Sequence, residues 1–212
     1  MTVEPLWLVA VASFAALLTA WLLTPVVKVF IDSQSLWVRS HAHLYLAALA
    51  GVGAAALADN AFELLAFTGA AVGCALLIVI DLAVHRLPDL LVAGTGLVLL
   101  VSLAGTAAVD DAWNAFGRSI LASVTLLCAY FVLALITPTG LGLGDVKFAA
   151  VIGLLLGWFG WTEVAIGTLL GFTLNGIIAL VMIISRRGNH DSEVPFGPSM
   201  VLGAALALAI SL

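Results

Sequence analysis

Residues 140–157 read GLGLGDVKFAAVIGLLLG, and this stretch places a carboxylate and an ammonium at the start of an otherwise apolar segment. The two charged residues are Asp145 and Lys147. An ionisable side chain at or near membrane depth is costly, so it indicates function. The alternating glycines that precede it include Gly142 and Gly144, which permit backbone conformations closed to other residues and leave room for a substrate backbone.

The segment is expected to form a helix over about 145–160. In such a helix Asp145 is followed at steps of four by Ala149, Gly153 and Gly157, which therefore share its face. This face has almost no side-chain bulk. It predicts that another helix packs closely there, so that the carboxylate faces a neighbouring helix and not lipid.

The composition shows a membrane protein. Of the 212 residues, 64% are hydrophobic and only 9% are charged, and the mean hydropathy is +1.25. About a quarter of the residues of a soluble domain are charged. With seven Lys and Arg and a net charge of −5, the chain lacks the basic surface that nucleic acid requires. Cys74 and Cys128 stand singly in apolar runs, which is not the pattern of a zinc or disulfide site.

The apolar runs predict an all-α, polytopic membrane protein with about eight transmembrane helices. A run is counted as a span when its length is near the roughly 20 residues that cross a bilayer. The expected spans are about 5–27, 42–58, 63–82, 90–109, 116–137, 145–160, 162–184 and 195–212. No linker separates them, so residues 1–212 are interpreted as a single domain with a short cytoplasmic loop, 28–43. The N-terminal run lacks a basic leader and cleavage site and is interpreted as a retained first span.

The distribution of basic residues predicts the orientation. With the N-terminus outside, six of the seven basic residues lie on the cytoplasmic side and only Arg118 lies outside, as the positive-inside rule requires. The six are Lys28, Arg39, Arg86, Lys147, Arg186 and Arg187.

Asp81 is the expected partner of Asp145. It ends an apolar run on the same predicted membrane side and at nearly the same depth. Two apposed carboxylates that cannot both ionise share a proton, so one acts as a base toward water while the other donates to a carbonyl oxygen. This is the chemistry of an aspartic protease, and it needs no metal.

Three further features have interpretations of their own: Asp89, the segment 195–198 and the two tryptophans Trp158 and Trp161. Asp89 is expected to cap the next helix or to bind a basic substrate segment. The segment from Pro195 through Pro198 starts the last span and is expected to shape the backbone near the pair. Trp158 and Trp161 are interpreted as interfacial anchors.

These segments resemble the type IV prepilin peptidases, which belong to the intramembrane aspartic proteases marked by Gly-x-Gly-Asp. Residues 142–147 resemble the second catalytic motif, and Asp81 with the Leu-Pro-Asp segment at 87–89 resembles the first. Residues 194–198, which include Pro195, Phe196, Gly197 and Pro198, resemble the segment that opens the last helix.

The resemblance implies an aspartic endopeptidase of the bacterial cytoplasmic membrane that removes the short basic leader of type IV pilin-like precursors. Its catalytic pair would be Asp81 and Asp145, carried on helices within about 63–160. Gly142, Gly144, Lys147, Asp89 and residues 195–198 would shape the site. The expected partners are such a precursor and membrane lipid.

One departure from the family concerns its second activity. Many members carry a larger cytoplasmic region with two zinc-binding Cys-x-x-Cys pairs and also methylate the new N-terminus, whereas the region 28–43 contains no cysteine. The sequence therefore predicts a peptidase without cofactor or metal. The alternative is a small proton-linked transporter in which Asp81, Asp145 and Lys147 form a relay.

Overall fold

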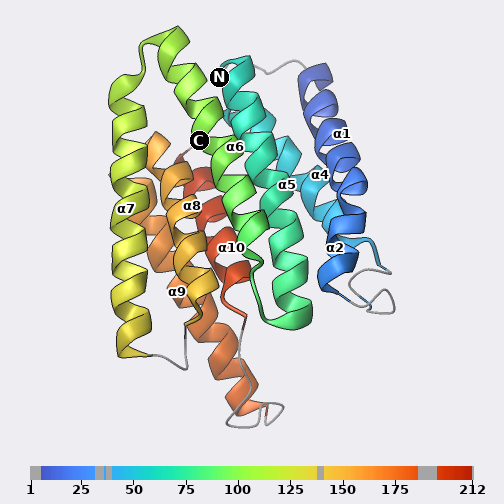
Figure 1. The fold of residues 1–212 in the computed structure, drawn as a ribbon, viewed down its shortest axis with the longest axis vertical. Helices are drawn as coiled ribbons and strands as arrows, with labels where there is room; N and C mark the ends of the chain where they lie inside the picture. The colour runs from blue at the N-terminus through green and yellow to red at the C-terminus, as the bar shows by residue number, and fades with distance from the viewer. Residues whose placement is uncertain (1–5, 32–35, 37–39, 138–140, 186–194, 212) are drawn as a thin grey trace.

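The computed structural model describes residues 6–31, 36, 40–137, 141–185 and 195–211, and within these the fold is entirely helical, without strands (Figure 1). The helices are α1 (Leu6–Leu22), α2 (Thr24–Phe30), α4 (Ala42–Leu57), α5 (Ala61–Val84), α6 (Asp89–Asp110), α7 (Trp113–Ile136), α8 (Leu143–Phe159), α9 (Trp161–Ile184) and α10 (Gly197–Ser211).

The eight predicted spans coincide with these helices, with one difference. The first span is broken into α1 and α2, which meet at an angle of 46°. The break lies beside Pro25, whose ring lacks the N–H that a continuous helix needs. By length and composition α5, α6, α7 and α9 can each cross a membrane, and the bent pair makes a fifth candidate. The all-α, polytopic fold class is confirmed, with α4, α8 and α10 as shorter helices.

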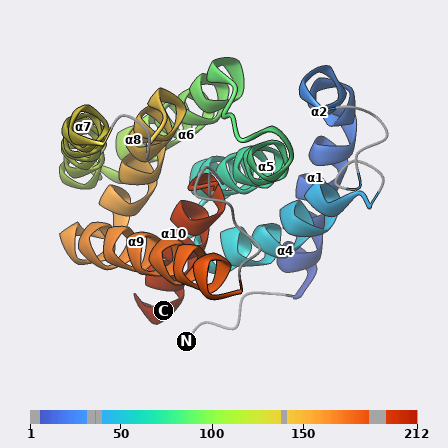
Figure 2. The same cartoon turned by 90° about the horizontal axis from the view of Figure 1, so that it is seen from below.

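α5 lies in the middle of the bundle. Seen from the end at which α5, α7 and α9 finish (Figure 2), α1, α2 and α4 lie on one side of α5, and α7, α8 and α9 lie on the other. α5 packs directly against α4, α6 and α1, and it also contacts α10. Its buried residues include Leu76, Leu77 and Ile80, so the last turns of α5 are enclosed by protein.

The expected close packing along the face of α8 that has small side chains is confirmed, and the neighbour is α7. A Cβ atom added at Gly153 would lie 2.7 Å from the Ala122 carbonyl oxygen, and one at Gly157 would lie 2.9 Å from the Ser119 Cα. Only glycine lets the two backbones approach this closely. Gly203 has the same role between α10 and α9, where an added Cβ would lie 2.6 Å from the Gly167 carbonyl oxygen.

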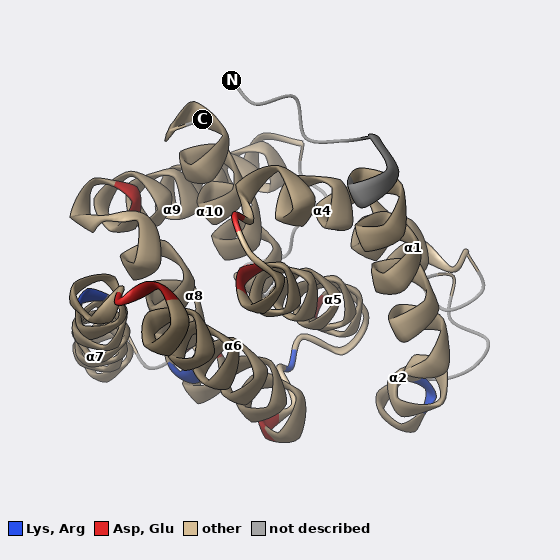
Figure 3. Cartoon of the chain, turned by 90° about the horizontal axis from the view of Figure 1, so that it is seen from above, with Lys and Arg blue, Asp and Glu red and all other residues tan. Residues whose placement is uncertain are grey.

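Many of the charged residues lie near helix ends (Figure 3). Arg118 of α7 binds the last carbonyls of α8, with Nε 2.7 Å from the Gly157 oxygen and Nη2 2.5 Å from the Trp158 oxygen. The interpretation of Trp158 as an interfacial anchor is wrong. Trp158 is buried and donates from Nε1 to the Glu63 carboxylate at 3.0 Å, whereas Trp161 is half exposed.

Candidate active site

Asp81 lies in the last turn of α5 and is 4% exposed. Its Oδ2 accepts a hydrogen bond of 2.9 Å from the backbone N–H of Gly197, the first residue of α10. The first N–H groups of a helix have no partner within the helix, and they carry the positive end of its dipole. The start of α10 therefore fixes the Asp81 carboxylate by a backbone donor from a segment 116 residues away.

Asp145 lies in the first turn of α8 and is partly buried. Its Oδ2 accepts from the backbone N–H of Gly142 at 3.0 Å, so the carboxylate folds back over the start of its own helix. The carboxylates of Asp145 and Asp81 interact electrostatically. The fold thus brings the two predicted aspartates together from α5 and α8, at the same end of the bundle.

A glycine contact joins the two predicted motifs. A Cβ added at Gly144 would lie 3.1 Å from the Leu87 Cβ and 3.3 Å from the Leu87 carbonyl oxygen. Leu87 belongs to the connection between α5 and α6, so this contact holds the segment after Asp81 against the start of α8. Glycine at 144 therefore provides space between two parts of the protein.

The expected unusual backbone at the glycines is not found at Gly142 or Gly144. Gly142 has φ −78° and ψ 155°, an extended conformation that any residue adopts, and Gly144 lies within α8. No described glycine has a φ in the left-handed range, between about +20° and +160°. Gly140, also part of the quoted stretch, lies outside the described residues.

Lys147 binds Asp89 across the site. Its Nζ lies 2.7 Å from Asp89 Oδ2, and both side chains are about half exposed or more. The expectation that Asp89 caps the next helix by a side-chain hydrogen bond is wrong: α6 begins at Asp89 itself, and Pro88 occupies the cap position without such a bond. As the first helical residue, Asp89 still meets the positive end of the α6 dipole.

The segment 195–198 anchors the start of α10 in an aromatic cluster. Phe196 is buried, and the centroid of its ring lies 6.0 Å from the ring centroid of Tyr130 and 5.1 Å from that of Phe172. Pro195 precedes the helix and Pro198 is its second residue, where the missing N–H costs nothing. Tyr130 also interacts electrostatically with Asp145.

Two residues beside the aspartate pair, Tyr130 and His85, were not among the predicted site residues. Tyr130 is one aromatic residue in the apolar run of α7, and nothing in its spacing distinguishes it from core. His85 ends α5 in the left-handed conformation, donates its backbone N–H to the Asp81 carbonyl oxygen at 2.8 Å, and interacts electrostatically with the Asp81 carboxylate. Its spacing of four residues from Asp81 was the available signal.

Within the part of the chain that the structure describes, no three His, Cys, Asp or Glu side chains come together as metal ligands would. The arrangement around Asp81 and Asp145 instead consists of two carboxylates, each oriented by a backbone N–H, beside a buried tyrosine. Such a pair can hold one proton between its members and can move protons to and from a bound water.

The sequence profile of the type IV leader peptidase family matches residues 68–185, more than half of the chain. The chain belongs to this family. The matched range contains Asp81, Asp145 and the Leu87–Gly144 contact, whereas the Pro-Phe-Gly-Pro segment lies beyond it.

Similar proteins carry the name prepilin leader peptidase/N-methyltransferase. The one from Stutzerimonas stutzeri is 29% identical over 133 residues, which are 61% of this chain and 44% of that protein. The one from Pseudomonas aeruginosa is 30% identical over 103 residues, which are 48% of this chain and 33% of that protein. The chain thus spans less than half the length of these curated relatives. No solved structure matches it significantly.

Proposed function

We propose that the chain is an aspartic endopeptidase that works within the membrane and removes the short basic leader from type IV pilin-like precursors. The observation that carries the proposal is the convergence of Asp81 and Asp145 from two helices, each held by a backbone N–H. Membership of the type IV leader peptidase family supports the substrate class. The helices act as one peptidase unit, because the site draws on α5, α8 and α10.

In the proposed reaction, one aspartate is ionised and the other is protonated. The ionised carboxylate takes a proton from water as the water oxygen attacks the scissile carbonyl carbon, while the other donates its proton to the carbonyl oxygen. The tetrahedral intermediate then collapses: the carbon–nitrogen bond breaks, the carboxyl that received the water proton gives it to the leaving amine, and the other carboxylate takes a proton back from a hydroxyl of the intermediate as the new carbonyl forms. Proton transfers balance within the pair.

The site faces the cytoplasm in this proposal. The basic residues Lys28, Arg86 and Lys147 lie at or near the helix ends on the side of the aspartates, and Arg118 lies near the opposite end. This distribution supports cytoplasmic placement of the pair by the positive-inside rule. The remaining basic residues of the predicted distribution, Arg39, Arg186 and Arg187, lie outside the described residues.

The transporter alternative requires ionisable groups at successive depths along a path. Asp81 lies in the last turn of α5 and Asp145 in the first turn of α8, so both stand at one end of the bundle. Lys147 is bound to Asp89 at that same end. These positions favour a compact hydrolytic site over a relay.

Co-expression with a candidate type IV precursor tests the proposal. Wild type is expected to convert the precursor to a product shorter by its leader, with the new N-terminus identified by mass spectrometry. Asp81→Asn and Asp145→Asn are each expected to abolish conversion while the protein remains in the membrane fraction at the wild-type level. Cleavage that persists in either variant would contradict the two-carboxylate mechanism.

A further inference from the structure

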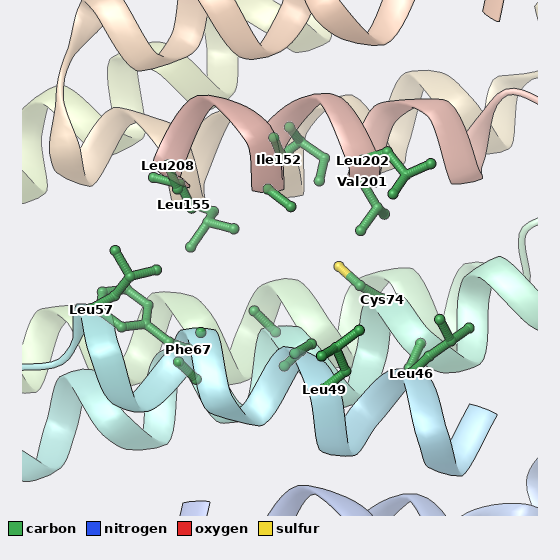
Figure 4. A pocket seen from close by; sticks show the side chains of 18 of the residues that line it. Leu46, Leu49, Leu57, Phe67, Cys74, Ile152, Leu155, Val201, Leu202 and Leu208 are labelled. Atoms are coloured by element: carbon green, nitrogen blue, oxygen red, sulfur yellow. The ribbon is translucent and has the colours of Figure 1, made fainter. Parts of the chain in front are cut away.

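An apolar groove of about 340 Å³ lies among α4, α5, α8 and α10. Its walls are hydrocarbon side chains and the thiol of Cys74, without a charged residue. Figure 4 shows Cys74 of α5 pointing into the space toward Val201 of α10, with Leu49 of α4 on the same side of the space as Cys74. The volume is at the small end of the range for ligand pockets, about 300–1,000 Å³.

The groove and Asp81 lie on the same face of α5. Phe67, Ala71, Cys74 and Ile78 line it at alternating steps of four and three residues, and the next step of three reaches Asp81. Residues at this spacing share one face of a helix. On α5 the groove therefore extends over about 16 Å, from Phe67 to Ile78 at 1.5 Å per residue, and it ends one turn before Asp81.

The other walls also lead to the site. α10 begins at Gly197, which binds the Asp81 carboxylate, and α8 carries Asp145 in its first turn. Both helices contribute lining residues further from that end, such as Leu202 and Leu155. Three of the four walls thus converge on the groups that surround the two carboxylates, and only α4 belongs solely to the groove.

We propose that this groove binds the apolar helical segment of the substrate that adjoins the scissile bond. The inference rests on the proposed peptidase function and adds the surface that positions the substrate. A segment in hydrocarbon must satisfy its own backbone hydrogen bonds, so it enters as a helix. The groove receives side chains from one face of that helix. Because the groove ends one turn from Asp81, the scissile bond at the cytoplasmic end of the apolar segment lies between the two carboxylates.

Gly53 of α4 offers a substitution that fills the groove without disturbing the fold. It lines the groove, and a Cβ added there meets nothing within 4 Å. Gly53→Leu is expected to slow leader removal by about tenfold or more, the scale of one misfitted side chain in a hydrophobic pocket. Gly117→Leu is the matched control, because a Cβ added at Gly117 also meets nothing within 4 Å. Gly117 lies four residues after the start of α7 and does not line the groove.

Cys74 supplies an independent measurement. In a Cys128→Ser background, Cys74 is the single cysteine of the chain. It is combined with a series of precursors, each of which carries one cysteine at a different position of its apolar segment. Membranes that contain both proteins are oxidised with copper phenanthroline. Asp145→Asn is added to retain the uncleaved precursor. Cross-links to Cys74 are expected at positions spaced three or four residues apart, on one face of the substrate helix, and are expected to fall in the Gly53→Leu variant.

The outcomes separate this inference from the proposed function. If wild type does not cleave the precursor, the peptidase proposal fails. If wild type cleaves but Gly53→Leu matches Gly117→Leu and no periodic cross-links form, the groove proposal alone is overturned, as expected for a groove filled by lipid. Cross-links between two Cys74 residues in place of substrate cross-links would overturn it as well, and would indicate contact between two copies. If Gly53→Leu fails to accumulate, the cross-linking pattern of the protein that retains Gly53 decides whether the groove binds the substrate helix.

Discussion

Gly197→Ala tests how the Asp81 carboxylate is held. A Cβ at position 197 would lie 2.8 Å from Asp81 Oδ2, and ordinary contact begins at 3.4 Å, so the oxygen must retreat by about 0.6 Å. The hydrogen bond from the Gly197 N–H is now 2.9 Å. A retreat of this size takes Asp81 Oδ2 beyond ordinary hydrogen-bond distance from the Gly197 nitrogen.

The structural cost of this substitution is small because the colliding atom is the end of a side chain. Loss of a hydrogen bond to a charged group costs about 1.5–3 kcal/mol, and alanine recovers up to about 1 kcal/mol through its better helix propensity. The net loss of unfolding free energy is expected to be about 1–2 kcal/mol. The effect on the proposed reaction is larger, because a displacement of about 1 Å at a reacting group costs about 100-fold. We expect leader removal to slow by about 10- to 100-fold.

The assay is a time course of leader removal by purified protein in detergent, normalised to folded protein by thermal unfolding. Gly203→Ala is the matched control on the same helix. There an added Cβ would meet the backbone of α9 at Gly167 and Gly171, which cannot rotate away. It should lower stability by about 1–3 kcal/mol, the usual cost of overpacking, and leave the rate per folded molecule near wild type. Wild-type cleavage by Gly197→Ala, or equal rate losses in both variants, would refute the reasoning.

Substitutions at three further positions have expected outcomes that thermal unfolding in detergent measures. Gly157→Leu forces a side chain against the α7 backbone and should lower stability by more than about 3 kcal/mol, the upper range for overpacking; a wild-type midpoint would contradict the packing described. Arg118→Ala removes charged donors from the end of α8 and should cost about 2–3 kcal/mol, and Arg118→Lys should recover only part of this, since lysine lacks the planar fork. Lys147→Ala breaks an exposed ion pair with Asp89 and should cost less than about 1 kcal/mol; a larger loss would show that the pair is buried in the membrane-bound state.

The helices were largely predictable from the sequence, because membrane spans are long apolar runs whose ends carry polar residues. Close packing of another helix on α8 followed from the spacing of Gly153 and Gly157, whereas the identity of that helix, α7, came only from the structure. The break between α1 and α2 was not predicted, since hydropathy does not register a bend at Pro25. Trp158 was misjudged because a tryptophan near a span end suits either lipid headgroups or a buried acceptor, and Glu63 is 95 residues away.

The pairing of Asp81 with Asp145 at one end of the bundle was predictable from the sequence, but the contacts of these residues were not. Nothing near Asp81 in the sequence indicates that Gly197 donates to it, because the contact depends on where α10 starts. The partner of Lys147 was equally open, because a long flexible side chain at the start of α8 reaches several groups, and the structure shows it bound to Asp89. These contacts arise from the packing of helices, and no local pattern encodes them.

The glycines around the two aspartates are best explained by the scarcity of polar partners in a membrane. A carboxylate in apolar surroundings needs a donor, and the unpaired N–H groups at the start of a helix are donors that require no polar side chain. Gly197 and Gly142 supply such groups, and the absence of a Cβ leaves the carboxylate oxygen room to approach. The glycine-containing motifs around Asp81 and Asp145 therefore lie at helix starts, because the first N–H groups of a helix are backbone donors without a partner inside the helix. Any side chain at 197 is therefore expected to displace Asp81, whatever its polarity, so that Gly197→Ser should impair cleavage as Gly197→Ala does even though serine adds a hydroxyl donor.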